Sequence, residues 1–224
     1  MNLNDLNQLI EAKRQEITEW MEKKRSEVPI PIYGSVDVRD AGWKIAVVDA
    51  NHFPAGFNNV APEDEQPLSA LLKNHINRRD EKCRWVHLYP ESHTRNAAYV
   101  ENLKTLQRLI EQAGFRCTVG STELADHGSL AGISGPLNLD IVSLQMVNDE
   151  ESIVVNGKQP DLILLNNDLT EGIVPGLGTS RVSPPPVMGW HSRKKSHHYE
   201  ALSDYVSEIA ELIGIEPWWL ITDW

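Results

Sequence analysis

The stretch from Asp161 to Leu169 constrains the fold most strongly, because an apolar run ends abruptly there at three polar side chains. The run Leu162–Leu165 predicts a buried strand of a parallel sheet, with Asn166, Asn167 and Asp168 at its carboxyl end. In open α/β sheets, ligands bind at that edge. An Asx turn without a ligand is the alternative, since Asn and Asp side chains also bond their own backbone.

Two further segments predict strands that end in polar loops. Residues 43–49 form one apolar run and residues 84–89 form another. The polar groups that end or follow these strands are Asp49, Asn51, Asn58, Asn59, Arg95 and Asn96. If all the strands belong to one parallel sheet, we expect these side chains to meet those of Asn166–Asp168 at a shared edge.

Strand and helix patterns alternate between residues 43 and 119, which predicts parallel strands joined by right-handed crossovers. The helices between them are expected over 62–79 and from about 97 to Gly114, where glycine closes the second helix. Residues 120–135 indicate a loop, and 139–155 a β-hairpin inserted before the Asp161 strand. The expected fold class is therefore α/β, a Rossmann-like, mostly parallel sheet with flanking helices and a hairpin insertion.

The termini lie outside this alternation. Residues 3–25 have apolar side chains near helical spacing and predict an amphipathic N-terminal helix, so we expect a helical segment over 1–28 and an α/β domain over 29–224. A last helix is expected over 199–213, with a boundary near residue 198.

Composition excludes several classes of protein. The formal net charge of −11 over 224 residues argues against nucleic acid as a partner. No apolar run is long enough to cross a bilayer, and the N-terminus lacks the pattern of a signal peptide, so we expect no membrane partner and a cytoplasmic location. Cys83 and Cys117 have no metal-binding spacing, and we expect no metal site.

A basic segment stands out against this negative charge. Residues 190–199 contain three cations and three histidines, a composition that suits a carboxylate or a phosphate. A solvated basic turn before a helix is the alternative. Familiar catalytic patterns, including the phosphate-binding P-loop and the GxSxG elbow, are absent from the sequence, so the catalytic residues are unknown at this point.

Four segments together resemble a known family. VDANHFPAGFNN (Val48–Asn59), PESHTRN (Pro90–Asn96), LLNNDL (Leu164–Leu169) and GWHSRKKSHHY (Gly189–Tyr199) are similar to proteobacterial glutamate-cysteine ligases of the GshA type, which are related to ATP-grasp ligases. The resemblance implies a domain like the one that precedes the ATP-grasp part, and it covers the amino-terminal half of such a ligase. Ser92 departs from the asparagine that the family's pattern would place in PESHTRN.

The resemblance implies ATP-dependent activation of the side-chain carboxylate of L-glutamate and attack by the amine of L-cysteine. The product is γ-glutamylcysteine, the first step of glutathione biosynthesis. ATP and Mg²⁺ are expected for the full ligase and no cofactor for this chain alone. The implied substrate-binding residues are Asp49, Asn51, Asn58, Asn59, Arg95, Asn96, Asn166, Asn167, Asp168, Arg193, Lys195 and Ser196.

Within that set, Arg95, Arg193 and Lys195 are expected to bind the anionic groups. A separate ATP-grasp half or a second copy of the chain is an expected partner. A stand-alone module that binds an acidic amino acid or assists assembly is the alternative function.

Overall fold

The computed structural model describes residues 3–28, 30–42, 44–92, 96–179 and 181–217. The helices are α1 (Leu3–Ala12), α2 (Arg14–Glu27), α3 (Glu65–Arg79), α4 (Ala97–Gln112) and α5 (Lys195–Ile213). The strands are β1 (Ser35–Asp40), β2 (Ile45–Asn51), β3 (Trp85–Pro90), β4 (Arg116–Val119), β5 (Ser129–Gly132), β6 (Gly135–Asn138), β7 (Val142–Val147), β8 (Glu150–Val155), β9 (Leu162–Asn166) and β10 (Val182–Ser183). In the described part of the chain, no helix has the length and apolar character to cross a membrane.

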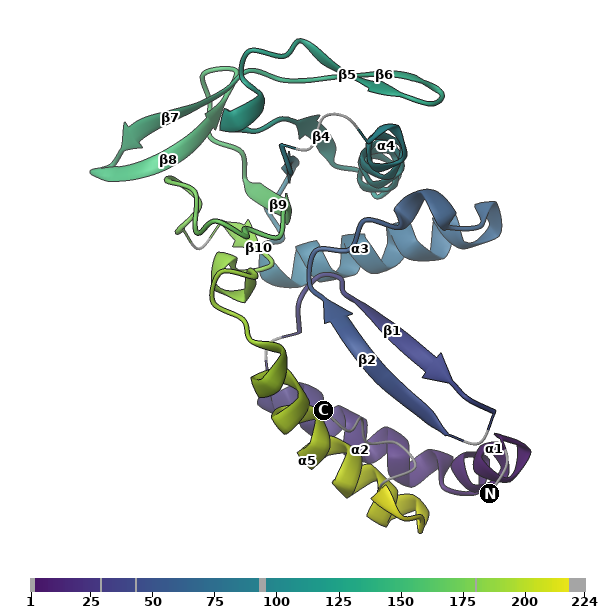
Figure 1. The fold of residues 1–224 in the computed structure, drawn as a ribbon. Coiled ribbons are helices and arrows are strands. Elements are labelled where there is room, and N and C mark those ends of the chain that lie inside the picture. Colours follow the sequence, from purple (N-terminus) through teal and green to yellow (C-terminus); the bar gives the residue numbers. More distant parts are fainter. Residues whose placement is uncertain (1–2, 29, 43, 93–95, 180, 218–224) are drawn as a thin grey trace. The chain divides into compact units, whose positions relative to one another are not determined.

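The chain forms two compact units (Figure 1). The first unit combines residues 1–30, 34–51 and 193–224, and the second combines 31–33 with 52–192.

A four-stranded parallel sheet organises the second unit, with strand order β10-β9-β3-β4. The central strands β3 and β9 are buried at every position. This confirms the α/β class and the buried parallel strand predicted from Leu162–Leu165. Because β9 pairs with β3 from Val86–Leu162 to Pro90–Asn166, the carboxyl ends of both strands lie at one edge of the sheet.

The two faces of this sheet have different covers (Figure 1). Val86 and Leu88 of β3 pack with the apolar sides of α3 and α4 in one core. Trp85 and Tyr89, which point the other way because side chains alternate along a strand, pack with Ile153 of β8 in a second core. Amphipathic helices therefore cover one face, and the inserted β7–β8 hairpin covers the other.

The hairpin β7–β8 confirms the predicted insertion, but a second hairpin and one short strand were not predicted. The predicted loop over 120–135 instead contains β5, which pairs with β6 in a second hairpin. The irregular segment before the basic residues contains the two-residue strand β10. Both misses have the same physical cause, since strands this short leave too few residues for an alternating pattern.

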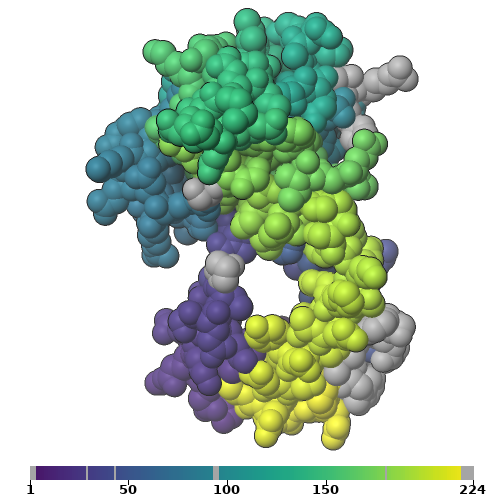
Figure 2. Space-filling view, turned by 90° about the vertical axis from the view of Figure 1, so that its left-hand side faces the viewer, coloured from purple at the N-terminus to yellow at the C-terminus, as the bar shows by residue number. Residues whose placement is uncertain are grey.

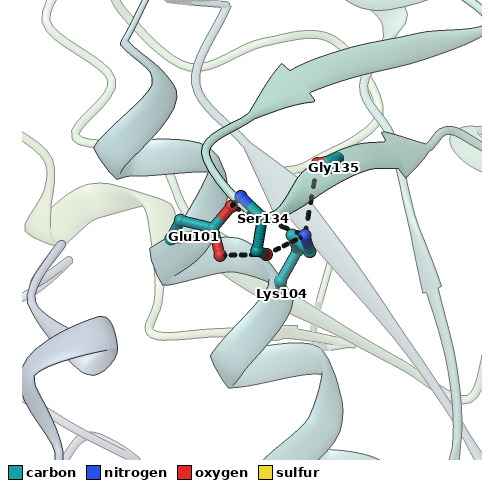
Figure 3. A network of polar contacts seen from close by, with 4 residues as sticks. All are labelled: Glu101, Lys104, Ser134 and Gly135. Carbon is teal, nitrogen blue, oxygen red and sulfur yellow. Dashed lines mark hydrogen bonds and ion pairs between the residues drawn. The ribbon is translucent and has the colours of Figure 1, made fainter.

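The second hairpin is fixed to α4 by a network of polar contacts (Figure 3). The Glu101 carboxylate accepts hydrogen bonds from the backbone N–H of Ser134 at 2.9 Å and from its hydroxyl at 2.7 Å. Lys104 bonds the Ser134 hydroxyl and donates to the Gly135 carbonyl at 3.2 Å. The turn between β5 and β6 is thereby held against the middle of α4.

Helices dominate the first unit. The N-terminal segment forms two helices, α1 and α2, separated at Lys13, rather than one continuous helix. The helix α2 lies beside α5, as the purple and yellow surfaces in Figure 2 show. Glu208 of α5 accepts from the Trp20 indole at 2.9 Å and forms an ion pair with Lys24 at 2.7 Å. The segment preceding the α/β domain is therefore tied to the end of the chain within this unit.

The strand predicted over 43–49 is present as β2, but its predicted place in the sheet was wrong. It pairs antiparallel with β1 in a separate two-stranded ribbon and is only half-buried. The physical reason is the short connection after β1, where Gly42 adopts φ +78° and its N–H bonds the Asp40 carboxylate at 2.7 Å. A turn this short joins neighbouring antiparallel strands, whereas a parallel pair needs a crossover of a dozen or more residues.

Candidate functional site

Asn166 ends β9 and lies in a buried polar network, with 1% of its surface exposed. Its side-chain N–H donates to the Pro54 carbonyl at 2.9 Å. Its side-chain oxygen accepts from the Asn102 amide at 3.2 Å, and its backbone carbonyl accepts from the Tyr99 hydroxyl at 2.8 Å. These bonds make Asn166 a positioning residue at the sheet edge. Its direct contact with a substrate stays a prediction.

The same network fixes the loop that carries Asn58 and Asn59. The buried Asn102 of α4 accepts a hydrogen bond from the Phe57 N–H at 3.0 Å. Together with the Asn166–Pro54 bond, this anchors the loop at two backbone positions. The side chains of Asn58 and Asn59 are exposed beyond the second anchor. Buried asparagines of the second unit thus present two exposed amides in a fixed loop.

Asn167 and Asp168 form a turn directly after β9. The Asn167 side-chain oxygen accepts from the Leu169 N–H at 2.9 Å, which is the Asx turn considered as the alternative above. Leu169 has φ +52°, in the left-handed region that is rare for a leucine. The Asp168 carboxylate, half-buried, accepts from the Thr170 hydroxyl at 2.8 Å. An Asx turn and a ligand-binding role for this strand end are therefore compatible, because the residues of the turn hold the Asp168 carboxylate in place.

Asn96 has a defined structural role as the N-cap of α4. Its side-chain oxygen accepts from the backbone N–H groups of Ala98 at 3.1 Å and Tyr99 at 3.3 Å, which satisfies two of the free donors at the helix start. The predicted anion-binding residue Arg95 lies outside the described residues.

In the first unit, the end of β2 and the basic segment meet. Lys195 forms an ion pair with Asp49 at 3.2 Å, and Arg193 donates to the Ala50 carbonyl at 2.5 Å. The Tyr199 hydroxyl donates to the Val48 carbonyl. The pairing register between β1 and β2 shifts at this point, so Val48 faces no residue of β1. Its carbonyl is therefore available to accept from the Tyr199 hydroxyl.

The basic side chains of this cluster lie at the start of a helix and are partly desolvated. The helix α5 begins at Lys195, four residues earlier than predicted, so the basic side chains occupy its positive end. Desolvation lowers the pKa of Arg193 and, with the nearby Arg193 charge, lowers the pKa of His198. The His198 Nε2 atom is buried and has no hydrogen-bond partner among the described residues.

Of the twelve predicted residues, eleven lie in the described part of the chain, and they fall into two sets. Asp49, Asn51, Arg193, Lys195 and Ser196 belong to the first unit, and Asn58, Asn59, Asn96, Asn166, Asn167 and Asp168 to the second. The structure brings Asp49, Arg193 and Lys195 together at one strand end. Each set is placed within its own unit, and the predicted meeting of the two sets stays a prediction.

Sequence reasoning missed two groups of residues at the sheet edge. Asn102 is 0% exposed in the interior of α4, and a single Asn in an amphipathic helix gives no signal of such a role. The loop after β4 places Thr122 and Glu123 in contact with Tyr89 of β3. The one available signal was the position of this loop directly after a predicted strand.

A metal centre is not formed by the described residues. Among them, no three or more His, Cys, Asp or Glu side chains gather into a group that could hold an ion. Cys83 and Cys117 are free and buried, and desolvation raises the pKa of the Cys83 thiol to about 11. These cysteines are therefore packing residues.

Comparisons with known proteins complete the description. The family model of glutamate-cysteine ligase (GshA) matches residues 7–224. A crystal structure from Methylobacillus flagellatus, of a protein provisionally named gamma-glutamylcysteine synthetase, is similar with a TM-score of 0.85 and 33% sequence identity. The alignment covers 98% of this chain and 52% of that one, so the chain spans about half the length of this relative. No curated protein matches. With a family match over nearly its whole length, the chain belongs to the glutamate-cysteine ligase family.

Proposed function

We propose that this chain is the amino-acid-binding part of an ATP-dependent ligase that joins L-glutamate and L-cysteine into γ-glutamylcysteine, in glutathione biosynthesis. The observation that carries the proposal is the family match over residues 7–224. The name of the Methylobacillus flagellatus relative agrees with it. The cytoplasm is the proposed location, where free thiols such as Cys83 and Cys117 stay reduced.

Arg193 and Lys195 are the proposed ligands of the substrate's carboxylate. Both lie beside the start of α5, whose backbone N–H groups add partial positive charge. The Lys195 side chain, which is paired with Asp49, is 53% exposed and is therefore accessible from solvent. A carboxylate held by two cations and a helix start is fixed in position as well as neutralised, which favours reaction at a neighbouring atom.

The polar residues of the second unit are proposed as further substrate-binding residues. Asn58 and Asn59 offer exposed amides from the anchored loop. The Asp168 carboxylate, oriented by Thr170, offers a counter-charge for an ammonium group. Asn51, Asn96, Asn167, Ser196 and Arg95 are retained as proposed site residues.

ATP and Mg²⁺ are the cofactors that glutamate-cysteine ligases use. Among the described residues, no three or more His, Cys, Asp or Glu side chains gather into a group that could hold a metal ion. The sequence also has no P-loop. We propose that the nucleotide is bound by polypeptide outside these 224 residues, in the same or a separate chain, because this chain spans about half the length of the Methylobacillus flagellatus relative.

Product formation tests this proposal. The purified chain, incubated with L-glutamate, L-cysteine, ATP and Mg²⁺, should yield no γ-glutamylcysteine by mass spectrometry while still binding L-glutamate. Addition of the remaining half of a related ligase should produce the dipeptide. Formation of γ-glutamylcysteine by the 224-residue chain alone would contradict the proposal that the nucleotide is bound outside it. Amino-acid binding that never leads to product in any combination would favour the stand-alone binding module instead.

A further inference from the structure

The segment Gly120–Glu123, here called the post-β4 loop, lies at the same sheet edge as the ends of β3 and β9. It follows β4 directly, and β4 pairs with β3 in parallel. The loop therefore occupies the position at which α/β sheets bind ligands, although none of its residues was selected from the sequence.

Neighbouring backbone holds the beginning of this loop in place. The Gly120 N–H donates to the Leu88 carbonyl at 3.2 Å, and the Gly120 carbonyl accepts from His87 Nε2 at 3.0 Å. A Cβ atom at Gly120 would lie 2.7 Å from the Asp140 carbonyl oxygen, so glycine is required for this close approach. The loop is thus anchored to β3 and packed against the segment that precedes β7.

Tyr89 orients the end of the loop. Its side chain is fully buried, and its hydroxyl lies 2.9 Å from Glu123 Oε2 and 2.8 Å from the Thr122 hydroxyl. The single phenolic proton is donated to the Glu123 carboxylate, while the Tyr89 oxygen accepts from the Thr122 N–H at 3.3 Å. A hydroxyl from the core of the sheet therefore fixes a carboxylate at its edge.

The Glu123 carboxylate is exposed and forms no ion pair with any described residue. Two residues earlier in the loop, Ser121 is 1% exposed and its hydroxyl oxygen has no hydrogen-bond partner among the described residues. Buried polar atoms are almost always bonded in folded proteins, so the Ser121 hydroxyl has a bonding position for a water or another small polar group.

We propose that Glu123 binds the ammonium group of an amino-acid substrate, with Tyr89 as its positioning residue. This proposal rests on the proposed function. A ligase that joins L-glutamate to L-cysteine must accommodate two amino groups: the ammonium of glutamate, and that of cysteine before it loses its proton and attacks. Asp168 after β9 and Glu123 after β4 lie on opposite sides of β3, roughly 10 Å apart from the spacing of strands, which is room for two separate counter-charges.

Calorimetry with paired ligands tests the assignment. L-Glutamate and L-cysteine are compared with glutarate and 3-mercaptopropionate, which lack the ammonium group. Glu123→Gln should weaken binding of at least one amino acid by about tenfold to a hundredfold, as expected for a lost charged hydrogen bond. The affinity of the Glu123→Gln variant for the analogue of that amino acid, glutarate or 3-mercaptopropionate, should equal that of the wild type. Tyr89→Phe, which keeps the carboxylate but frees it to rotate, should give a smaller loss in the same direction.

Glu111→Gln is the matched control, since Glu111 is exposed on α4 away from this edge and should leave all four affinities unchanged. Equal losses for an amino acid and its analogue, or no loss at all in Glu123→Gln, would overturn the assignment of Glu123 while the proposed function stands. A wild-type chain that binds neither amino acid would contradict the proposed function and this assignment together.

Discussion

Asn102 donates a hydrogen bond of 3.2 Å to the side-chain oxygen of Asn166, and both residues are buried from solvent. The pair joins the middle of α4 to the end of β9, and through Pro54 and Phe57 it anchors the loop that carries Asn58. Buried amides are costly unless they are bonded. The pair therefore serves to position the loop at the sheet edge.

Asn166→Ala should lower the free energy of unfolding by about 1–3 kcal/mol, because it leaves the Asn102 amide and the Pro54 carbonyl buried without their partner. Urea denaturation measures the effect. Asn74→Ala is the control, since Asn74 is exposed on α3 and its loss should change stability by less than about 0.5 kcal/mol. Equal stability of the two variants would refute the role assigned to the pair.

His87 should make stability depend on pH. Its Nε2–H bonds the Gly120 carbonyl and its Nδ1 accepts from Thr118, so the buried ring is neutral, and desolvation lowers the pKa of His87 to about 4. The unfolded chain has the ordinary value near 6.5 and takes up the proton first. The stabilisation is therefore complete above about pH 6.5 and is lost, by up to about 3 kcal/mol, as the pH falls towards 4.

The measurement is urea unfolding between pH 7 and pH 4 for the wild type and for His87→Gln. The variant should have the lower stability at pH 7 and the shallower decline, because its side chain does not titrate. His127→Gln, at an exposed position, should keep the wild-type slope. If the free energy of unfolding of His87→Gln falls with pH as steeply as that of the wild type, groups other than His87 cause the decline.

Ser134→Ala should loosen the β5–β6 turn, because it removes the hydroxyl that bridges Glu101 and Lys104 (Figure 3). We expect a loss of about 1 kcal/mol in the free energy of unfolding. Hydrogen exchange of the backbone amides around Ser134 should also become faster. Ser129→Ala, at an exposed position of β5, is the matched control. Unchanged exchange in Ser134→Ala would mean that the backbone contacts alone hold the turn.

The sequence predicts well those parts of the fold that local patterns determine. The buried strand at Leu162–Leu165, the helix closed at Gly114 and the β7–β8 hairpin follow from apolar spacing and turn residues. The pairing of β2 with β1 was mispredicted, because a half-buried strand of a ribbon and a strand of the sheet have similar apolar content. Tertiary pairing decides between them.

For the candidate site, strand-end polarity identified Asp49 and the Asn166–Asp168 turn, and charge density identified Arg193 and Lys195. Neither pattern identifies Asn102 or Glu123, because the roles of these residues depend on contacts with residues far away in the sequence.

Lys195→Gln should separate binding from stability. The ion pair with Asp49 has side chains 53% and 34% exposed, so its loss should change the free energy of unfolding by less than about 1 kcal/mol. The affinity for L-glutamate should fall by about tenfold or more, since a charged contact to the carboxylate is removed. Lys194→Gln, at the neighbouring exposed position, should affect neither quantity strongly. A large loss of stability with unchanged affinity would reverse the role given to Lys195.

The central claim is that this chain binds the amino-acid substrate of a glutamate-cysteine ligase, and calorimetric titration of L-glutamate into the wild-type chain tests it most directly. We predict saturable binding at a stoichiometry of one, with D-glutamate bound more weakly. Absence of saturable binding, or equal binding of both enantiomers, would contradict the claim.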